Sequence, residues 1–239
     1  MKEKKVIGVL GGMGPEATEY FFRLIFKNTA AVRDQEHAPV LIWNDPRIPP
    51  RTEAILGRGP SPLPGLLAGI KVLERGGAGM IVVPCLSAHF WAREIRAAAR
   101  VPFIDLVEET AKASKKLVPG LKKAGLLGST GTVRSGIFHR PFARRGLELV
   151  TPDDRGQERV MDAVFGLAGA KAGFTAGASR RMLLSVSREL VSRGAEAIIA
   201  GCTEVPLLLR EDDLPVPLID PMAAGARVCL AKAGFPLKA

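Results

Sequence analysis

The chain has 239 residues, with 34 Lys and Arg against 24 Asp and Glu, which gives a formal net charge of +10. Hydrophobic residues make up 47% of it, which excludes intrinsic disorder because there is ample apolar surface to bury. Its 26 glycines and 18 prolines follow no period, which excludes a collagen-like or low-complexity architecture. The length suits one large domain or two domains of about 100–120 residues each.

The basic charge raises the question of a nucleic-acid partner. The basic residues are spread along the chain, and one Tyr and two Trp supply few stacking surfaces, so we expect a solvated basic surface and no nucleic acid. No apolar stretch approaches the roughly 20 residues that span a bilayer, so we expect no membrane partner. The basic start, 1–5, leads into a strand without a cleavage site, and this pattern predicts a cytoplasmic protein.

Strands and helices alternate through the first half of the chain. Apolar runs bounded by Gly and Pro predict buried strands at 6–10, 40–43 and 80–83, and helices from Pro15 to about 29 and over about 66–75. A Pro-rich loop, 44–64, follows the second strand. This order predicts a parallel sheet that helices cover on both faces.

The second half of the chain repeats the first. Segment 8–14 matches 125–131, and 77–85 matches 194–202, so each match is shifted by 117 residues (125 from 8, 202 from 85). A third match, 101–105 with 216–220, is shifted by 115 (216 from 101). Three matches at nearly one shift predict an internal duplication of an α/β unit of about 110 residues.

The duplication predicts two doubly wound parallel-sheet domains, related by a pseudo-two-fold axis and facing a central cleft. We place the first domain at 1–103, completed by the C-terminal segment 217–239, and the second at 104–216. In open parallel sheets the ligand lies outside the carboxyl ends of the strands. We therefore expect the site where the corresponding strand ends of the two domains face each other.

Three cysteines, without a Cys-x-x-Cys pair, indicate neither a disulfide framework nor a zinc site. Cys229 fits a small buried hydrophobe in an apolar helical tail. Cys85 and Cys202 each follow a predicted strand at its carboxyl end, so they would approach one cleft from opposite sides. The alternative is two structural cysteines inherited from one ancestor. The hydroxyls that follow them, Ser87 and Thr203, favour a functional role.

A pair of thiols on opposite faces of one carbon suits the inversion of a stereocentre. One thiolate removes a proton and the other thiol delivers one to the far face, and a free Cys titrates near 8.5, so both forms are accessible. The C–H bond must be acidified, so the substrate should carry a carboxylate on that carbon. We expect N–H groups at helix N-termini after Cys85 and Cys202 to stabilise whichever thiolate forms.

Three segments carry recognisable motifs: 7–18 is a glycine-rich opening, 84–89 reads Pro-Cys-Leu-Ser-Ala-His, and 201–204 reads Gly-Cys-Thr-Glu. Together they resemble the cofactor-independent aspartate/glutamate racemase family, on its aspartate racemase branch, from Val6 to about Pro221. The resemblance implies an isomerase, an amino-acid racemase acting on aspartate or a related acidic amino acid. It also implies a homodimer and no cofactor, neither pyridoxal phosphate nor a metal.

The resemblance also assigns roles to residues. It makes Cys85 and Cys202 the two acid/base catalysts, without saying which serves which enantiomer. It places Arg51 on the substrate's side-chain carboxylate and Lys171 on a second carboxylate. The remaining substrate-binding positions are Met13, Leu86, Ser87, Thr130 and Thr203.

Each of these assignments has a structural alternative. Arg51 could be a surface arginine of the Pro-rich loop 44–64, a loop whose length also makes it a candidate lid. Lys171 could be a lysine at a helix C-terminus, facing the helix dipole before Gly173. The loop of Thr130 could cap a helix.

The first cysteine motif departs from the family pattern, in which Asn and Thr follow the Cys. Leu86 stands at the Asn position, and a leucine cannot hydrogen-bond the substrate. This keeps open a relative with another substrate: a broad-specificity, glutamate or hydantoin racemase, or a maleate isomerase-like enzyme. A non-catalytic binder of acidic metabolites is the alternative from another class. For His89 we expect a packing or surface role, with tuning of the Cys85 thiolate as the alternative.

Overall fold

The computed structural model describes residues 4–238. Residues 1–3 lie outside this range. They belong to the basic start on which the predicted cytoplasmic location rests. The chain forms two compact units: one runs up to Glu109 and resumes at Met222, and the other is Thr110–Pro221. Each unit holds a four-stranded parallel sheet with flanking helices, which confirms the predicted doubly wound α/β class. None of the helices between residues 4 and 238 has the length and apolar character to cross a membrane.

The sheet of the first unit has the strand order β2-β1-β3-β4. Its strands are β1 (Ile7–Gly11), β2 (Val40–Asn44), β3 (Met80–Val82) and β4 (Phe103–Ile104). All pair in parallel, and β1 is buried along its whole length because it lies between two strands and two helical layers. The three strands predicted in the first half are confirmed.

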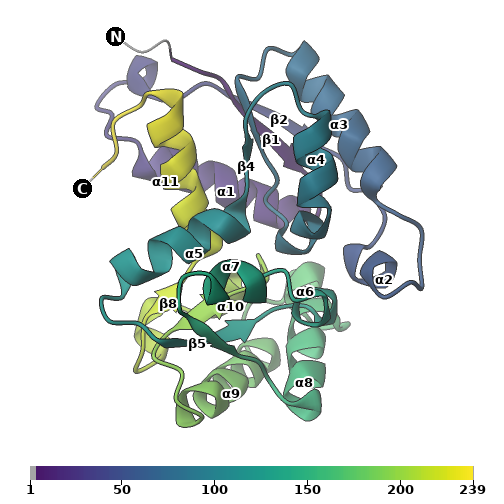
Figure 1. Ribbon diagram of the computed structural model, residues 1–239, viewed down its shortest axis with the longest axis vertical. Coiled ribbons are helices and arrows are strands. Elements are labelled where there is room, and N and C mark those ends of the chain that lie inside the picture. The colour runs from purple at the N-terminus through teal and green to yellow at the C-terminus, as the bar shows by residue number, and fades with distance from the viewer. Residues whose placement is uncertain (1–3, 239) are drawn as a thin grey trace. The chain divides into compact units, whose positions relative to one another are not determined.

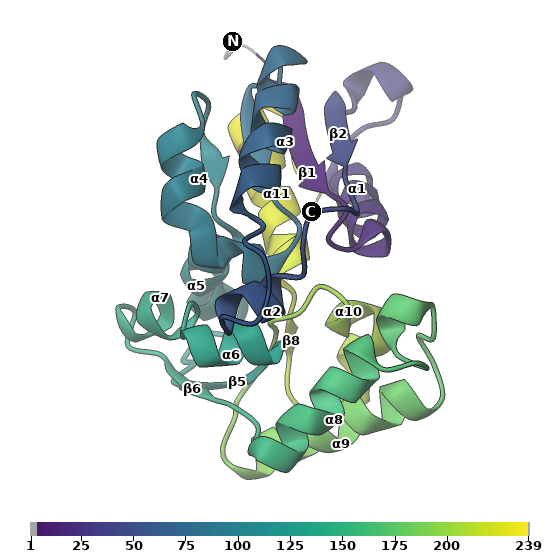
Figure 2. The same cartoon turned by 90° about the vertical axis from the view of Figure 1, so that its right-hand side faces the viewer.

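Helices cover both faces of this first sheet (Figures 1 and 2). On one face lie α1 (Pro15–Asn28) and α11 (Pro221–Ala233), and on the other lie α3 (Leu63–Arg75) and α4 (Ala92–Ala98). Helix α1 begins at Pro15 as predicted, because a proline needs no N–H partner in a first turn. Helix α5 (Leu106–Leu117) follows β4. Cys229 is fully buried on α11, as predicted.

The predicted loop 44–64 is partly wrong. It contains the short helix α2 (Arg51–Ile55), and α3 begins at Leu63 rather than near residue 66. The prolines of this segment suggested an irregular chain, but prolines are tolerated in a first helical turn, and Pro64 occupies one. As a result Arg51 stands at the start of a helix, where its position is fixed by backbone hydrogen bonding.

The second unit repeats this architecture with the strand order β6-β5-β7-β8. Its strands are β5 (Lys123–Leu127), β6 (Glu148–Val150), β7 (Ile198–Ala200) and β8 (Leu218–Ile219). Its longer helices are α8 (Asp154–Phe165) and α9 (Ala178–Ser192), and its short ones are α6 (Thr130–Ser135), α7 (His139–Ala143) and α10 (Val205–Leu208). Helix α9 packs against β5 and β7 (Figure 1).

The strand register reproduces the shift seen in the sequence. Gly8 pairs with Ile81 in the first sheet, and Gly125 pairs with Ile198 in the second, so both partners move by 117 positions. The strand order is also the same in the two sheets. The internal duplication therefore extends from the sequence to the pairing of individual residues, and it makes β3 and β7 equivalent strands.

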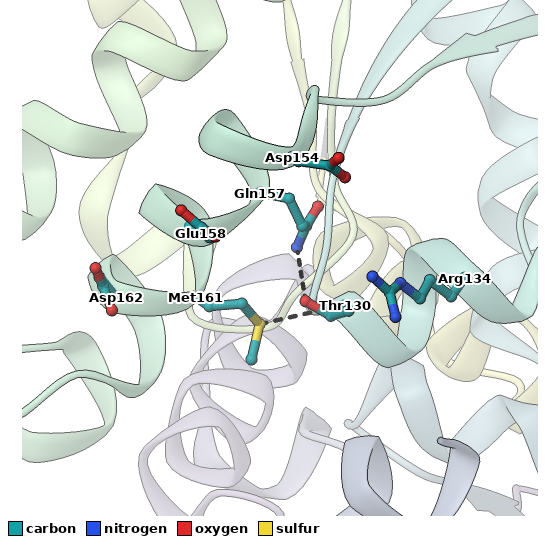
Figure 3. A pocket seen from close by; sticks show the side chains of 7 residues that line it. All are labelled: Thr130, Arg134, Asp154, Gln157, Glu158, Met161 and Asp162. Carbon is teal, nitrogen blue, oxygen red and sulfur yellow. Dashed lines mark hydrogen bonds between the residues drawn. The ribbon is translucent and has the colours of Figure 1, made fainter. Parts of the chain in front are cut away.

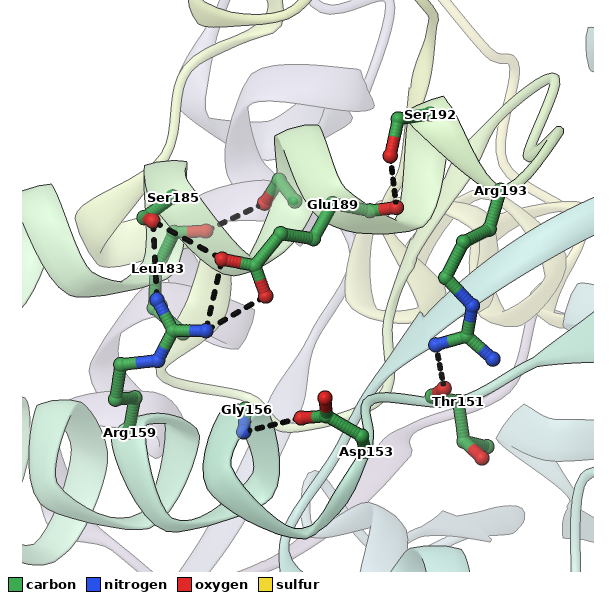
Figure 4. Close-up of polar contacts among 10 residues, drawn as sticks. Thr151, Asp153, Gly156, Arg159, Leu183, Ser185, Glu189, Ser192 and Arg193 are labelled. Carbon is green, nitrogen blue, oxygen red and sulfur yellow. Dashed lines mark hydrogen bonds and ion pairs between the residues drawn. The ribbon is translucent and has the colours of Figure 1, made fainter.

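Polar contacts join helices α8 and α9 of the second unit (Figure 4). Arg159 on α8 reaches both carboxylate oxygens of Glu189 on α9, at 2.8 and 2.6 Å. Asp153 caps α8 by accepting a hydrogen bond from the Gly156 N–H at 2.7 Å. Both contacts of Arg159 with Glu189 come from one nitrogen, Nη2, while Nη1 donates to the Ser185 hydroxyl at 3.0 Å, so the guanidinium joins α8 to two residues of α9.

A close backbone approach in the glycine-rich loop gives a prediction for stability. Gly12 and Gly57 both have positive φ, 93° and 72°, but a Cβ on Gly12 would lie 2.3 Å from the Asp45 carbonyl carbon, whereas one on Gly57 meets nothing within 4 Å. Gly57→Ala should lower the free energy of unfolding by about 1–2 kcal/mol through backbone strain alone. Gly12→Ala should cost about 1–3 kcal/mol more, because the backbone must also move. Urea unfolding measures both, and equal losses would contradict this account.

Candidate active site

The Cys85 thiol lies just beyond the carboxyl end of β3. Its backbone N–H donates to the Val83 carbonyl at 2.8 Å, which makes a tight turn, and its Sγ lies 3.5 Å from the Ser87 hydroxyl. The side chain is buried and belongs to an apolar cluster that includes Met13. The structure therefore brings two predicted binding residues, Met13 and Ser87, to the surroundings of this thiol.

The helix expected after Cys85 begins as a 3-10 helix. Residues Leu86–Trp91 form a 3-10 helix, and the α-helix α4 begins only at Ala92. Such 3-10 turns are common at the start of α-helices, and their dipole is short. The N–H groups near Cys85 therefore come from a tight turn rather than from a long helix. Leu86, which replaces the family Asn, is buried and offers no polar side-chain group.

Arg51 is half-buried and binds backbone carbonyls. Its Nη1 donates to the carbonyls of Ile48 at 3.0 Å and Pro49 at 2.8 Å, and its Nη2 donates to the Met13 carbonyl at 3.2 Å. Its Nε is buried and has no hydrogen-bond partner. Three of the five guanidinium N–H groups thus tie the segment before α2 to the glycine-rich loop. The Nε–H and one Nη2–H are left for an anion.

In the second unit, the Cys202 thiol lies two residues beyond β7 and belongs to a buried polar cluster. Its Sγ donates to Glu204 Oε2 at 2.9 Å, and the Thr203 hydroxyl donates to the same oxygen at 3.0 Å. The other carboxylate oxygen, Oε1, forms an ion pair with Lys171 Nζ. Three predicted residues, Cys202, Thr203 and Lys171, therefore meet at one carboxylate.

Burial raises the pKa of the Cys202 thiol well above its ordinary value, and the neighbouring negative charge of Glu204 raises it further. The Lys171 ammonium opposes this rise without cancelling it. A protonated thiol at neutral pH follows, because the thiolate would stand next to a carboxylate in a site that water barely reaches. In this arrangement the Cys202 thiol donates a hydrogen bond to Glu204.

Sequence reasoning did not assign a role to Glu204, although the Gly-Cys-Thr-Glu motif contains it. The signal was present: Glu204 is followed by the apolar run 205–209, which indicates a buried position where an isolated carboxylate is costly. Such a residue needs a cation and donors, and the structure supplies both. Lys171 itself lies on a 3-10 helix, Ala170–Ala172, that ends at Gly173 in the left-handed conformation. The structural alternative for Lys171 was a lysine at a helix C-terminus before Gly173. That alternative matches the backbone of Lys171, but it does not account for the ion pair with Glu204.

Thr130 has other surroundings. It opens α6, its N–H donates to Met161 Sδ at 3.2 Å, and its hydroxyl accepts from Gln157 Nε2 at 3.4 Å (Figure 3). The cap of α6 is Ser129, as the alternative for this loop proposed. The side chains line a cavity of about 540 Å³ whose other members are Arg134, Asp154, Glu158 and Asp162. Three carboxylates against one guanidinium do not favour a dicarboxylate ligand in that cavity.

Nothing in residues 4–238 groups three or more His, Cys, Asp or Glu side chains so that they could hold a metal ion. The first unit carries the Cys85 thiol, the Ser87 hydroxyl and the Arg51 guanidinium, and the second unit carries the Cys202 thiol, the Thr203 hydroxyl, the Glu204 carboxylate and the Lys171 ammonium. These groups can move protons and hold carboxylates.

Comparisons with known proteins agree with one another. The family model described as Asp/Glu/Hydantoin racemase matches residues 10–229. The chain is similar to the broad specificity amino-acid racemase RacX of Bacillus subtilis, with 29% identity over 231 residues and 95% of each chain covered. Its structure is similar to Picrophilus torridus aspartate racemase, with a TM-score of 0.86, 31% identity, and 98% and 96% of the two chains covered. An aspartate racemase homologue from Pyrococcus horikoshii shares the fold, with a TM-score of 0.75, 24% identity, and 98% and 99% covered.

The Cys202 cluster predicts opposite effects for two substitutions. Glu204→Gln removes the negative charge beside the thiol and should lower the Cys202 pKa. Lys171→Met removes the positive charge and should raise that pKa. A pH titration of the Cys202 13Cβ signal by NMR, assigned with Cys202→Ser, measures both. Movement of the two pKa values in the same direction would contradict the charge arrangement described above.

Proposed function

Because the chain belongs to the Asp/Glu/Hydantoin racemase family and is an isomerase, we propose that it inverts the α-carbon of aspartate or a related acidic amino acid. In this proposal Cys85 and Cys202 are the two acid/base catalysts, and no cofactor takes part. The observation that carries it is the Cys202 thiol held by Glu204 beyond β7, with Cys85 beyond the equivalent strand β3. The family resemblance also leads us to propose a homodimer in the cytoplasm.

In the proposed step, the Cys85 thiolate removes the α-proton from one face of the substrate. The electron pair of the broken C–H bond stays on the α-carbon, where the carboxylate delocalises it. The Cys202 thiol, protonated because its pKa is raised, then donates its proton to the opposite face. The enzyme leaves this step with Cys85 protonated and Cys202 as a thiolate, which is the form that the reverse reaction requires.

Glu204 gives Cys202 a route to act as a base. A thiolate beside an ionised Glu204 would place two negative charges 2.9 Å apart in a buried site. After Cys202 has donated its proton, the pair takes up one proton from water, which rests on Glu204 while Cys202 is a thiolate and is released when Cys202 regains a proton from the substrate. Lys171 balances the single remaining charge. We therefore propose Glu204 as the proton partner of Cys202 in the direction where Cys202 removes the α-proton.

The carboxylates of the substrate need cations. We propose that Lys171 and the unused N–H groups of Arg51 supply these cations, with Ser87 and Thr203 as hydroxyl partners and Met13 and Leu86 as apolar walls; the acidic cavity beside Thr130 gives that residue no part in this proposal. Arg51 supports this role through its buried Nε, because an unpaired guanidinium N–H that is out of water favours an anionic partner.

A specific observation supports a second candidate, a racemase with a broader range of amino acids. Leu86 is buried where the family motif has an amide, so this wall cannot bind a polar group of the substrate. The RacX relative, described as a broad-specificity racemase, spans 95% of this chain. In this alternative the two thiols keep their roles and only the side-chain recognition changes.

Exchange of the α-proton tests the two-thiol scheme. In D2O, deuterium should enter the α position of aspartate, and Cys85→Ser or Cys202→Ser should each slow racemisation by more than 100-fold, because general acid–base groups contribute about 10²–10⁴. Cys229→Ala is the matched control: this thiol is buried on α11, and the variant should keep its activity within about twofold. Full activity in either catalytic-thiol variant would refute the scheme.

The same assay on a panel of substrates separates the alternatives. Exchange confined to acidic amino acids supports the leading proposal, and exchange with neutral amino acids supports the broader racemase. Turnover of hydantoins or maleate alone would assign another reaction of the superfamily. Binding of aspartate without any exchange would identify a non-catalytic binder.

A further inference from the structure

His89 is buried behind the turn that carries Cys85, and both of its ring nitrogens face acceptors. Nδ1 lies 3.1 Å from Asp105 Oδ1, and Nε2 lies 3.2 Å from the Val83 carbonyl oxygen. The ring of Phe103 covers the imidazole, with the two ring centroids 5.4 Å apart. The side chain is 1% exposed, so water cannot replace either contact.

This geometry defines the protonation state of the ring. A neutral imidazole has one N–H and one bare nitrogen, so one of its nitrogens would direct a lone pair at a carboxylate or a carbonyl. In a buried site that contact is repulsive, and it disappears when both nitrogens carry hydrogen. An imidazolium satisfies both contacts, because it donates to Asp105 on one side and to Val83 on the other.

Asp105 is itself held in place on the far side of the pair. Its Oδ1 accepts from the N–H groups of Val107 and Glu108 at 3.1 and 3.3 Å, at the start of α5. Its Oδ2 accepts from Arg96 of α4 at 3.0 Å. Burial alone would raise the pKa of Asp105, but the hydrogen bond and charge of His89, with the Glu108 N–H and Arg96, hold it well below its usual range. Asp105 is thus ionised throughout the physiological range.

We propose that His89 is a positioning residue for Cys85: as an imidazolium between Asp105 and Val83, it fixes the turn from which the thiol projects. The Val83 carbonyl joins the two parts, because it accepts from His89 Nε2 and also from the Cys85 N–H at 2.8 Å. Loss of the His89 proton removes one of the two ring contacts and loosens the turn. The inference rests on the proposed role of Cys85 in racemisation.

In the second unit no histidine stands at the position equivalent to His89. Residue 206, which lies 117 positions after His89, is a proline, and the polar partner of Cys202 is Glu204 instead. The two thiols are therefore held differently: a cation fixes the backbone before Cys85, and an anion binds the sulfur of Cys202.

The first experiment identifies the protonation state without using activity. Long-range 1H–15N NMR of the 15N-histidine protein, with His89 assigned through His89→Gln, should show both of its ring nitrogens protonated at about pH 8, where a free imidazole is neutral. A bare nitrogen on His89 under these conditions would overturn the proposal.

The second experiment tests positioning, using Asp105→Asn. Asparagine still caps α5, but the loss of charge weakens the preference for the imidazolium. The alkaline limb of kcat/KM should move down by about one pH unit or more, in step with the His89 NMR signals. Asp153→Asn is the matched control: Asp153 caps α8 through Gly156 without a histidine, and this variant should leave the limb in place.

Two further readouts keep the outcomes distinct. The alkylation rate of Cys85, followed by mass spectrometry against pH, should change in Asp105→Asn and in His89→Gln, while that of Cys229 should not. If the protein shows no racemase activity but these rates follow the His89 signals, the proposed function fails and the positioning role stands. An unchanged kcat/KM limb and unchanged Cys85 alkylation, despite shifted His89 signals, would overturn the positioning role.

Discussion

A single buried carboxylate organises the chemistry of the second unit. Glu204 is excluded from water, so its charge must be satisfied by the protein, and Cys202, Thr203 and Lys171 are the groups that satisfy it. This requirement draws together two separate stretches of the chain: Cys202 and Thr203 after β7, and Lys171 on the distant 3-10 helix. Burial and the Glu204 charge keep the Cys202 thiol protonated to a higher pH than an ordinary cysteine.

The duplicated scaffold explains why two thiols occupy equivalent strand ends, and divergence explains why their surroundings differ. The same register of β1 with β3 and of β5 with β7 sets each thiol just past a central strand. The polar partners of the two thiols differ. His89 contacts the Val83 carbonyl in the turn before Cys85, whereas Glu204 contacts the sulfur of Cys202 directly. One duplicated geometry thus carries two different electrostatic environments.

The sequence predicted the architecture well because its signals are local. Apolar runs, Pro15 at a helix start and the repeated segments define the strands, the first helix and the duplication, and all three agree with the structure. It predicted the partners of the site poorly. The ion pair of Lys171 with Glu204 and the contact of His89 with Asp105 join residues 33 and 16 positions apart, and their distances depend on packing that no local pattern encodes. The helix α2 was missed for a related reason, since prolines mark both loops and first helical turns.

The burial of Cys229 has a consequence for how this protein responds to oxidants. Burial raises the pKa of this thiol to about 12, so it is almost never a thiolate, and thiolates are the species that peroxides attack. Its place on the packed face of α11 also keeps sulfenic acid chemistry away from the core. Oxidation of Cys229 would therefore be slow, and the packing around α11 would be preserved under conditions that oxidise accessible thiolates.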